Sequence, residues 1–151
     1  MTLIQTRVAT LADVEVIAPL FDAYRQFYEQ APDWCCQGFI DARLKNDESV
    51  VLLAFGEDGQ AVGFCQLYPT FCSVEAKPIY SLYDLFVVPE ARRSGAGTVL
   101  LKAAEALAAE RGKSRMDLTT AKSNKAAQAA YEALGWQRDE VFFAYSKAVK
   151  A

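Results

Sequence analysis

The segment from residue 82 to residue 111 constrains the fold more than any other part of the sequence. An apolar stretch ends at Pro89, and Gly95 and Gly97 follow before a helix with apolar residues at three- and four-residue steps. The first N–H groups of such a helix have no intrahelical partner, and glycines let a ligand approach them closely. The helix dipole adds positive potential, so the segment predicts a strand, loop and helix that can hold a phosphate group.

Two common nucleotide-binding motifs do not fit this loop. A Walker A loop needs Gly-Lys followed by Ser or Thr, and the Rossmann fingerprint needs a third glycine where Leu100 stands. A different phosphate ligand is therefore expected. A Gly-x-Gly at a helix start also fits an ordinary capped helix, so the loop alone leaves both interpretations open.

The rest of the chain predicts strands and helices in the order β-α-α-β-β-β-α-β-α-β. Thr10-x-x-Asp13 is typical of a capping pair that opens a helix, Pro32 breaks that helix, and the turn at residues 56–59 joins two strands into a hairpin. This order implies a mixed α/β sheet with helices on its faces. Strands are expected at residues 3–8, 49–55, 61–71, 79–88, 114–119 and 141–146, and helices at 10–29, 33–46, 97–111 and 124–134.

The composition of the chain limits the classes of protein to which it can belong. A length of 151 residues with 52% hydrophobic residues predicts one globular domain over residues 1–151. The net charge of −3 argues against general affinity for nucleic acid. The chain has neither an apolar run of the roughly 20 residues that cross a bilayer nor a secretory h-region, so we expect a cytoplasmic protein that binds no membrane.

Histidine is absent, and the four cysteines form no C-x-x-C pair. A zinc site is therefore not expected, and a catalytic thiol would lack its usual base. The cysteines are expected to act as small hydrophobes in a reduced compartment.

The loop motif Arg92-x-x-Gly95-x-Gly97 resembles the (Gln/Arg)-x-x-Gly-x-(Gly/Ala) signature of the GNAT superfamily of acyl-CoA-dependent N-acetyltransferases. A second match lies downstream at the family's usual distance: Asn124-x-x-Ala127-x-x-x-Tyr131-x-x-x-Gly135-Trp136 is similar to its second cofactor motif, which usually ends in Gly-Phe. The resemblance is close over residues 82–136. It implies a mixed, mostly antiparallel sheet with about four helices, splayed at a bulge where the pantetheine arm of acetyl-CoA enters.

The resemblance also implies which residues bind acetyl-CoA as co-substrate. Backbone groups of the splayed strand would pair with the pantetheine amides, and N–H groups of the loop would hold the pyrophosphate beside two arginines. Lys122 and Lys125 could reach the 3′-phosphate, although charged residues at helix ends are usually only solvated. The implied cofactor-binding residues are Leu85, Phe86, Val87, Arg92, Arg93, Ser94, Gly95, Ala96, Gly97, Thr98, Asn124 and Tyr131.

Acetyl transfer to an amine needs two proton-handling groups. The ammonium must lose a proton, and the departing CoA thiolate benefits from gaining one. Tyr131 matches the family tyrosine near the thioester sulfur and is the expected donor. Asp84 is a carboxylate on an otherwise apolar strand, where burial without purpose would be costly. It could act through a water, orient the ammonium or cap a neighbouring strand, and Glu29 is a second candidate base.

The acceptor region of the family lies against the first two helices. Aromatic rings and carboxylates there suit a cation, although each ring could equally pack a helix on the sheet. Some polyamine-acetylating members have Glu-Asp where this chain has Tyr83-Asp84, which counts against a polyamine substrate. The candidate acceptor residues are Tyr24, Phe27, Tyr28, Glu29, Asp33, Trp34 and Tyr83.

We therefore expect an enzyme that moves an acetyl group from acetyl-CoA to a primary amine of a small cationic molecule, by direct attack in a ternary complex. One alternative is acetylation of a protein N-terminus or lysine. A second, of another class, is an acyl-CoA-binding regulatory module without turnover. The strand at residues 141–146 could lie at a sheet edge or between subunits, as in many members of this superfamily, and a homodimer is expected.

Overall fold

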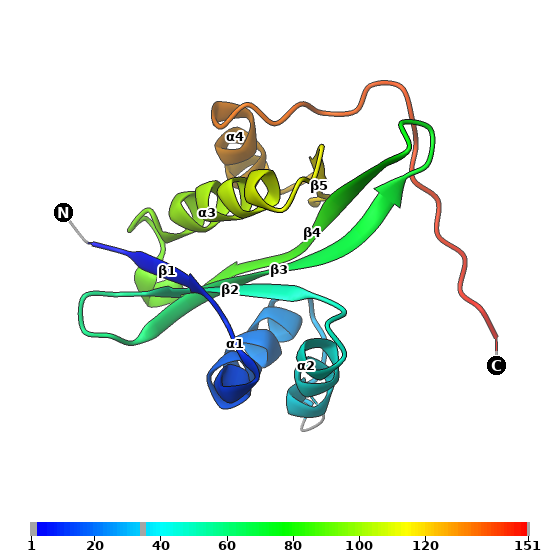
Figure 1. Cartoon of the computed structure of the whole chain (residues 1–151). Coiled ribbons are helices and arrows are strands. Elements are labelled where there is room, and N and C mark those ends of the chain that lie inside the picture. Colours follow the sequence, from blue (N-terminus) through cyan, green and yellow to red (C-terminus); the bar gives the residue numbers. More distant parts are fainter. Residues whose placement is uncertain (1–2, 34–35, 151) are drawn as a thin grey trace. The chain divides into compact units, whose positions relative to one another are not determined.

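The computed structural model describes residues 3–33 and 36–150, so Trp34 lies outside the described residues. The chain divides between Thr119 and Thr120 into two compact units, each described here by itself. The second unit holds α4 (Lys125–Ala133). The first unit holds β1 (Gln5–Val8), α1 (Val14–Phe27), α2 (Cys36–Lys45), β2 (Val50–Phe55), β3 (Ala61–Cys72), β4 (Lys77–Val87), α3 (Ala96–Glu110) and β5 (Met116–Asp117) (Figure 1).

The sheet of the first unit has the strand order β1-β2-β3-β4-β5. The first three pairings are antiparallel, and β4 pairs with β5 in parallel. Gly59, at φ 80°, completes the turn between β2 and β3, where its N–H donates to the Gly56 carbonyl at 3.0 Å. The predicted mixed, mostly antiparallel sheet is confirmed.

Helices cover both faces of this sheet, which explains why its central strands are apolar almost throughout. In Figure 1, α1 and α2 lie on one face and α3 on the other. Ile17, Phe21 and Ile40 of the first two helices join Val51 and Phe64 of the sheet in one buried cluster. Leu100 and Ala104 of α3 are fully buried as well. A strand covered on both faces reads as a continuous apolar run, as β2 does.

The start of α1 is fixed by the predicted capping pair. The Asp13 carboxylate accepts the Thr10 N–H at 2.8 Å and two hydrogen bonds from the Arg7 guanidinium, each of 2.8 Å. The Arg7 charge and these hydrogen bonds lower the pKa of Asp13 to about 2. A short 3₁₀ turn, Leu11–Asp13, precedes α1.

Two sequence predictions need correction. The strand expected at 114–119 is formed only at Met116–Asp117, and the strand expected at 141–146 is not formed. The Asp139 carboxylate instead accepts the N–H groups of Val141 and Phe142 at 2.8 and 3.0 Å, which turns the backbone. Phe143 and Tyr145 are 86% and 92% exposed. The aromatic-rich sequence of residues 141–146 predicted a strand, but a strand also needs a paired neighbour.

Within the described part of the chain, no helix combines the length and the apolar character that a membrane span requires.

Candidate active site

A β-bulge divides β4 into two parts. The register of β3 and β4 passes from Leu67 opposite Leu82 to Gln66 opposite Asp84, so Tyr83 has no residue opposite it. Such a bulge bends the strand and re-aims the side chains that follow it. The Tyr83 side chain is 69% exposed.

Beyond the bulge, β4 is paired on one side only among the described residues. The parallel pairing with β5 covers Tyr80 and Ser81 and stops there. The Val88 N–H donates to the Val62 carbonyl at 2.9 Å, which points it towards β3. Because backbone directions alternate along a strand, the N–H and C=O groups of Leu85 and Val87 point away from β3, whereas those of Phe86 face it. Leu85 and the N–H of Val87 can therefore pair with an added chain, whereas the Val87 carbonyl already accepts Arg92 Nε at 3.0 Å and the groups of Phe86 face β3.

The loop after β4 ends in unpaired N–H groups. It passes a 3₁₀ turn at Pro89–Ala91, then Arg93 at φ 67° and Gly95 at φ 88°, before α3 begins at Ala96. The Ala96 N–H donates to the Ser94 hydroxyl at 3.3 Å. In the described part of the chain, the N–H groups of Gly97 and Thr98 have no hydrogen-bond partner. Free donors at the positive end of a long helix fit a phosphate group.

The side chain of Arg92 binds the protein itself. Its Nε donates to the Val87 carbonyl at 3.0 Å, and its guanidinium carbon lies 5.6 Å from the ring centre of Phe27 and 5.7 Å from that of Phe86. These contacts tie the loop to the end of α1. Arg92 therefore shapes the loop, and both Arg92 and Arg93 are exposed.

Asp84 is buried at the start of the splayed part of β4. Its residue is 5% exposed, and its Oδ2 accepts a hydrogen bond from Gln66 Nε2 at 2.7 Å. The Gln66 Oε1 in turn accepts the Ser49 hydroxyl at 2.7 Å. The predicted buried carboxylate is thus present, and Gln66 and Ser49 are additions that the sequence reasoning missed. A glutamine and an aspartate in opposed apolar strands of one hairpin were the available signal.

Burial raises the pKa of Asp84, while hydrogen bonds from Gln66 and Tyr24 lower it. The Tyr24 hydroxyl also lies 3.4 Å from the Tyr83 carbonyl oxygen. Burial and the nearby Asp84 charge raise the pKa of Tyr24, and the same two causes raise that of Tyr68 to about 12. A buried carboxyl group among tyrosines in their neutral form suits proton uptake from a cation.

Aromatic side chains of α1 gather beside this carboxyl group. Tyr24 packs edge-on against Tyr28 and Phe86, with ring centres 5.2 and 6.3 Å apart. Tyr28 is 48% exposed. Of the other candidate acceptor residues, Glu29 is exposed just beyond α1 with φ 63°.

The second unit contains the second motif. Asn124 caps α4, its side-chain oxygen accepting the Ala127 N–H at 3.2 Å. Tyr131, on the same helix, lies with its ring centre 6.0 Å from that of Trp136. Gly135, at φ 92°, ends the helix, as the motif predicts.

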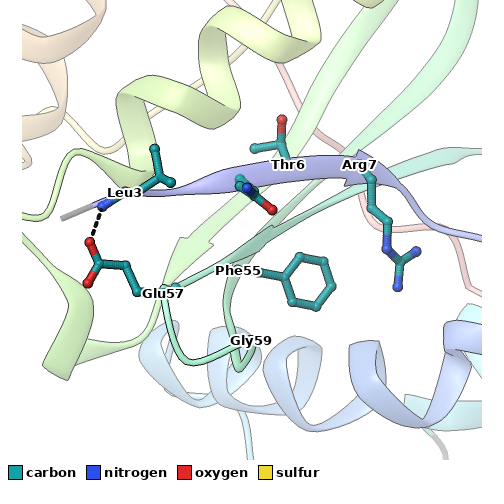
Figure 2. Close-up of a pocket in the computed structure, with 8 residues that line it drawn as sticks. Leu3, Thr6, Arg7, Phe55, Glu57 and Gly59 are labelled. Atoms are coloured by element: carbon teal, nitrogen blue, oxygen red, sulfur yellow. Dashed lines mark hydrogen bonds between the residues drawn. The ribbon is translucent and has the colours of Figure 1, made fainter.

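The first unit also contains a pocket of about 510 Å³. It is formed by β1 and the turn between β2 and β3, and Figure 2 shows Leu3, Arg7, Phe55 and Glu57 around it. Its charged side chains already have partners: Arg7 binds Asp13 and lies 5.0 Å from the Phe55 ring centre, and Glu57 accepts the Leu3 N–H at 3.1 Å. None of the predicted site residues lines it.

Known relatives match nearly the whole chain. The chain is 48% identical over 146 residues to the uncharacterized N-acetyltransferase YhfO of Bacillus subtilis (strain 168), a match that covers 96% of this chain and 97% of that protein. It is 34% identical over 116 residues to an aminoglycoside N(6')-acetyltransferase type 1 of Klebsiella aerogenes, with 70% and 74% covered.

Solved structures share the fold. The crystal structure of a probable acetyltransferase superposes with a TM-score of 0.90 at 36% identity, over 97% of this chain and 99% of that one. The aminoglycoside N-acetyltransferase AAC(6')-Iy in complex with CoA superposes with a TM-score of 0.80 at 22% identity, over 99% and 97% of the two chains, which shows a common fold.

The model of the acetyltransferase (GNAT) family matches residues 15–136. This span includes the bulged strand, the glycine loop and both motifs. The chain is therefore a member of the GNAT family of acetyltransferases.

Proposed function

We propose that this acetyltransferase moves an acetyl group from acetyl-CoA to a primary amine of a small cationic molecule, by direct attack in a ternary complex. The observation that carries the proposal is the end of β4. There, outward backbone groups of Leu85 and Val87 lead within one short loop to the free N–H groups of Gly97 and Thr98. A ligand with amides at one end and a pyrophosphate at the other, such as CoA, fits this sequence of donors and acceptors.

The acceptor side of the proposal rests on Asp84 and the rings of α1. A buried carboxyl group with a raised pKa can take the proton that an alkylammonium must lose. Tyr24 and Tyr28 offer ring faces to a cation nearby. The aminoglycoside acetyltransferase among the relatives supports a small amine of this chemistry, and we place diamines, amino-acid amides and aminoglycosides first among the compounds to test.

Tyr131 is the proposed proton donor to the departing thiolate. This role follows from its place in the second motif, and the aromatic contact with Trp136 steadies its ring within its own unit. Tyr131→Phe keeps the ring and removes the hydroxyl. We expect its kcat to fall roughly 10²-fold, while its Kd for acetyl-CoA stays close to that of the wild type.

Calorimetric titration with acetyl-CoA tests the cofactor site. Gly97 has an ordinary backbone conformation, and the nearest atom to an added Cβ is a Val87 methyl group at 4.0 Å. Gly97→Ala should therefore fold and bind, whereas the bulk of Gly97→Tyr should block the phosphate cradle and abolish binding. Equal binding by both variants would reject this site.

A screen for thiol release tests the acceptor. The panel contains small amines in one arm and peptides with free N-termini or lysines in the other. Turnover confined to the peptides would replace the proposed small-molecule acceptor by a protein acceptor. Mass spectrometry of the product identifies the acetylated nitrogen.

A further inference from the structure

Three polar side chains from three neighbouring segments of the sheet form a continuous hydrogen-bonded array. Ser49 precedes β2, Gln66 lies in β3 and Asp84 in β4, and the two hydrogen bonds that join them are both 2.7 Å long. Gln66 is fully buried, and the other two residues are 4% and 5% exposed. We define these three residues as the Ser49–Asp84 array.

The direction of the array is set at its charged end. A carboxylate only accepts hydrogen bonds, so the amide nitrogen of Gln66 faces Asp84, and Gln66 Oε1 accepts the Ser49 hydroxyl. A donor facing a carboxylate favours its charged form, and it opposes the effect of burial on Asp84. The same contact fixes one carboxyl oxygen, Oδ2, and so orients the carboxyl group.

The surroundings of position 66 favour an apolar residue. The surrounding segment of β3 is buried and otherwise apolar, and a buried polar group stabilises the fold only when it is fully partnered. Among the described residues, every buried side-chain nitrogen and oxygen has a partner. The array therefore persists as a complete unit whose one charged end lies at the splayed part of β4.

We propose that Gln66 and Ser49 are positioning residues, which hold Asp84 charged and oriented to take the proton of the substrate ammonium; this inference rests on the proposed acetyl transfer. In that step an N–H bond of the ammonium breaks, its electron pair stays on nitrogen as the nucleophile, and the proton binds Asp84. The carboxylate passes from charge −1 to neutral. The freed amine attacks the acetyl carbonyl carbon and forms the N–C bond, and the C–S bond breaks with its electron pair on the CoA sulfur. The new amide nitrogen then loses its extra proton and the CoA sulfur gains one, which gives the amide and free CoA thiol.

Other titratable groups surround Asp84 and must be considered in any pH profile. Tyr24 faces it from α1, Cys65 and Tyr68 from β3, and Tyr83 precedes it on β4. The pKa of Cys65, like that of Tyr68, is raised to about 12. The raised pKa values of Tyr24, Cys65 and Tyr68 lie above the range in which a carboxyl group titrates, so these three groups do not obscure Asp84.

Gln66→Met tests the proposal, because methionine has a similar volume and no amide. The readout is the pH titration of the Asp84 carboxyl carbon by ¹³C NMR, with Asp84→Asn used to identify the signal. The proposal expects the midpoint to move to higher pH. Leu67→Met, a change at the adjacent and equally buried position, controls for altered packing and should leave the midpoint in place.

The pH profile of kcat/KM gives a second readout. A base acts when deprotonated, so a higher Asp84 midpoint moves the rising limb of the kcat/KM profile to higher pH. At a pH on that limb, kcat/KM of Gln66→Met should be roughly ten- to a hundredfold below that of the wild type. Ser49→Ala removes only the hydroxyl that donates to the Gln66 amide oxygen, and should give a smaller change of roughly two- to fivefold.

Each outcome has one meaning. If the Asp84 titration midpoint is unchanged in Gln66→Met, or shifts equally in Leu67→Met, the claim that the array controls Asp84 is wrong. If the Asp84 midpoint shifts but the rising limb of the kcat/KM profile does not, the array has no role in the reaction. If the wild type transfers no acetyl group to any amine, the proposed function fails, while the NMR titration still decides whether Gln66 and Ser49 control Asp84.

Discussion

The two parts of β4 differ in how they are held. Before the bulge, the strand pairs with β3 on one side and with β5 at Tyr80 and Ser81 on the other. After the bulge, residues 84–87 pair with β3 only, among the described residues, and leave backbone groups directed outwards. One strand thus combines a doubly paired part, which should govern stability, with a singly paired part, which should govern activity.

The largest expected effect tests the singly paired part. Asp84→Asn keeps the hydrogen bond from Gln66 and removes the base, so kcat/KM should fall roughly 10²- to 10⁴-fold. Steady-state kinetics with the best amine of the screen measures it. Activity within about twofold of the wild type would show that positioning alone accounts for the rate, and that the proposed division of β4 is wrong.

The same substitution should raise stability. Burial raises the pKa of Asp84, so the folded state holds this proton to a higher pH than the unfolded state does. The free-energy cost of burying the charged Asp84 carboxylate is absent below the pKa that Asp84 has in the unfolded chain. It grows as the pH rises through the pKa of Asp84 in the folded state. Asp84→Asn should therefore have a higher Tm than the wild type at pH 7, and the difference should shrink towards pH 4 in scanning calorimetry.

Tyr80→Ala tests the doubly paired part. Tyr80 is 2% exposed, and large aromatic residues replaced by alanine in a core cost about 3–5 kcal/mol of unfolding free energy. Urea unfolding measures the loss. Tyr80→Phe, which removes only the hydroxyl that accepts a hydrogen bond from Arg111 at 3.4 Å, should cost about 1 kcal/mol and serve as the milder variant. A loss of activity in the Tyr80→Ala protein that remains folded would show that the doubly paired part of β4 also governs activity.

Gly63→Ala sharpens the comparison, because it acts where β3 faces the singly paired part. A Cβ on Gly63 would lie 2.7 Å from the Phe86 carbonyl oxygen, so the end of β4 must shift. We expect a loss of about 1–3 kcal/mol in stability and a higher KM for acetyl-CoA. Gly56→Ala, whose Cβ would meet atoms at 3.4 and 3.6 Å, is the control. An unchanged KM would mean that the position of β4 there does not matter.

The smallest effect lies outside β4. Asp13→Asn weakens the capping hydrogen bonds and the Arg7 ion pair, at a cost of about 0.5–2 kcal/mol, with kinetics unchanged. Because the pKa of Asp13 is lowered to about 2, its contribution is complete above about pH 4 and is lost as pH falls towards 2. Wild type and variant should therefore differ in Tm at pH 6 and converge at pH 2.

Local patterns predicted most of this fold and part of the site. Glycines, prolines and apolar spacing located the helices and the β2–β3 hairpin to within a few residues, because these signals act within one turn or one strand. Asp84 was found because a charge in an apolar strand stands out. Gln66 and Ser49 were missed, because their importance arises from the register that brings them to Asp84.

The segment at residues 141–146 shows the opposite case. Its aromatic residues are typical of a strand, yet no strand forms there. A strand requires pairing, and sequence pattern cannot supply the partner. The expected homodimer stays a prediction, and a sedimentation mass equal to one chain would refute it.

The buried Asp84 carboxyl group also makes this enzyme unusually easy to observe. The chain has no histidine, so the side chain that normally dominates titration between pH 5 and 8 is missing. Burial moves Asp84 towards this nearly silent interval. A spectroscopic or kinetic transition that is recorded there and disappears in Asp84→Asn would belong to this carboxyl group, and would follow a single proton through the reaction.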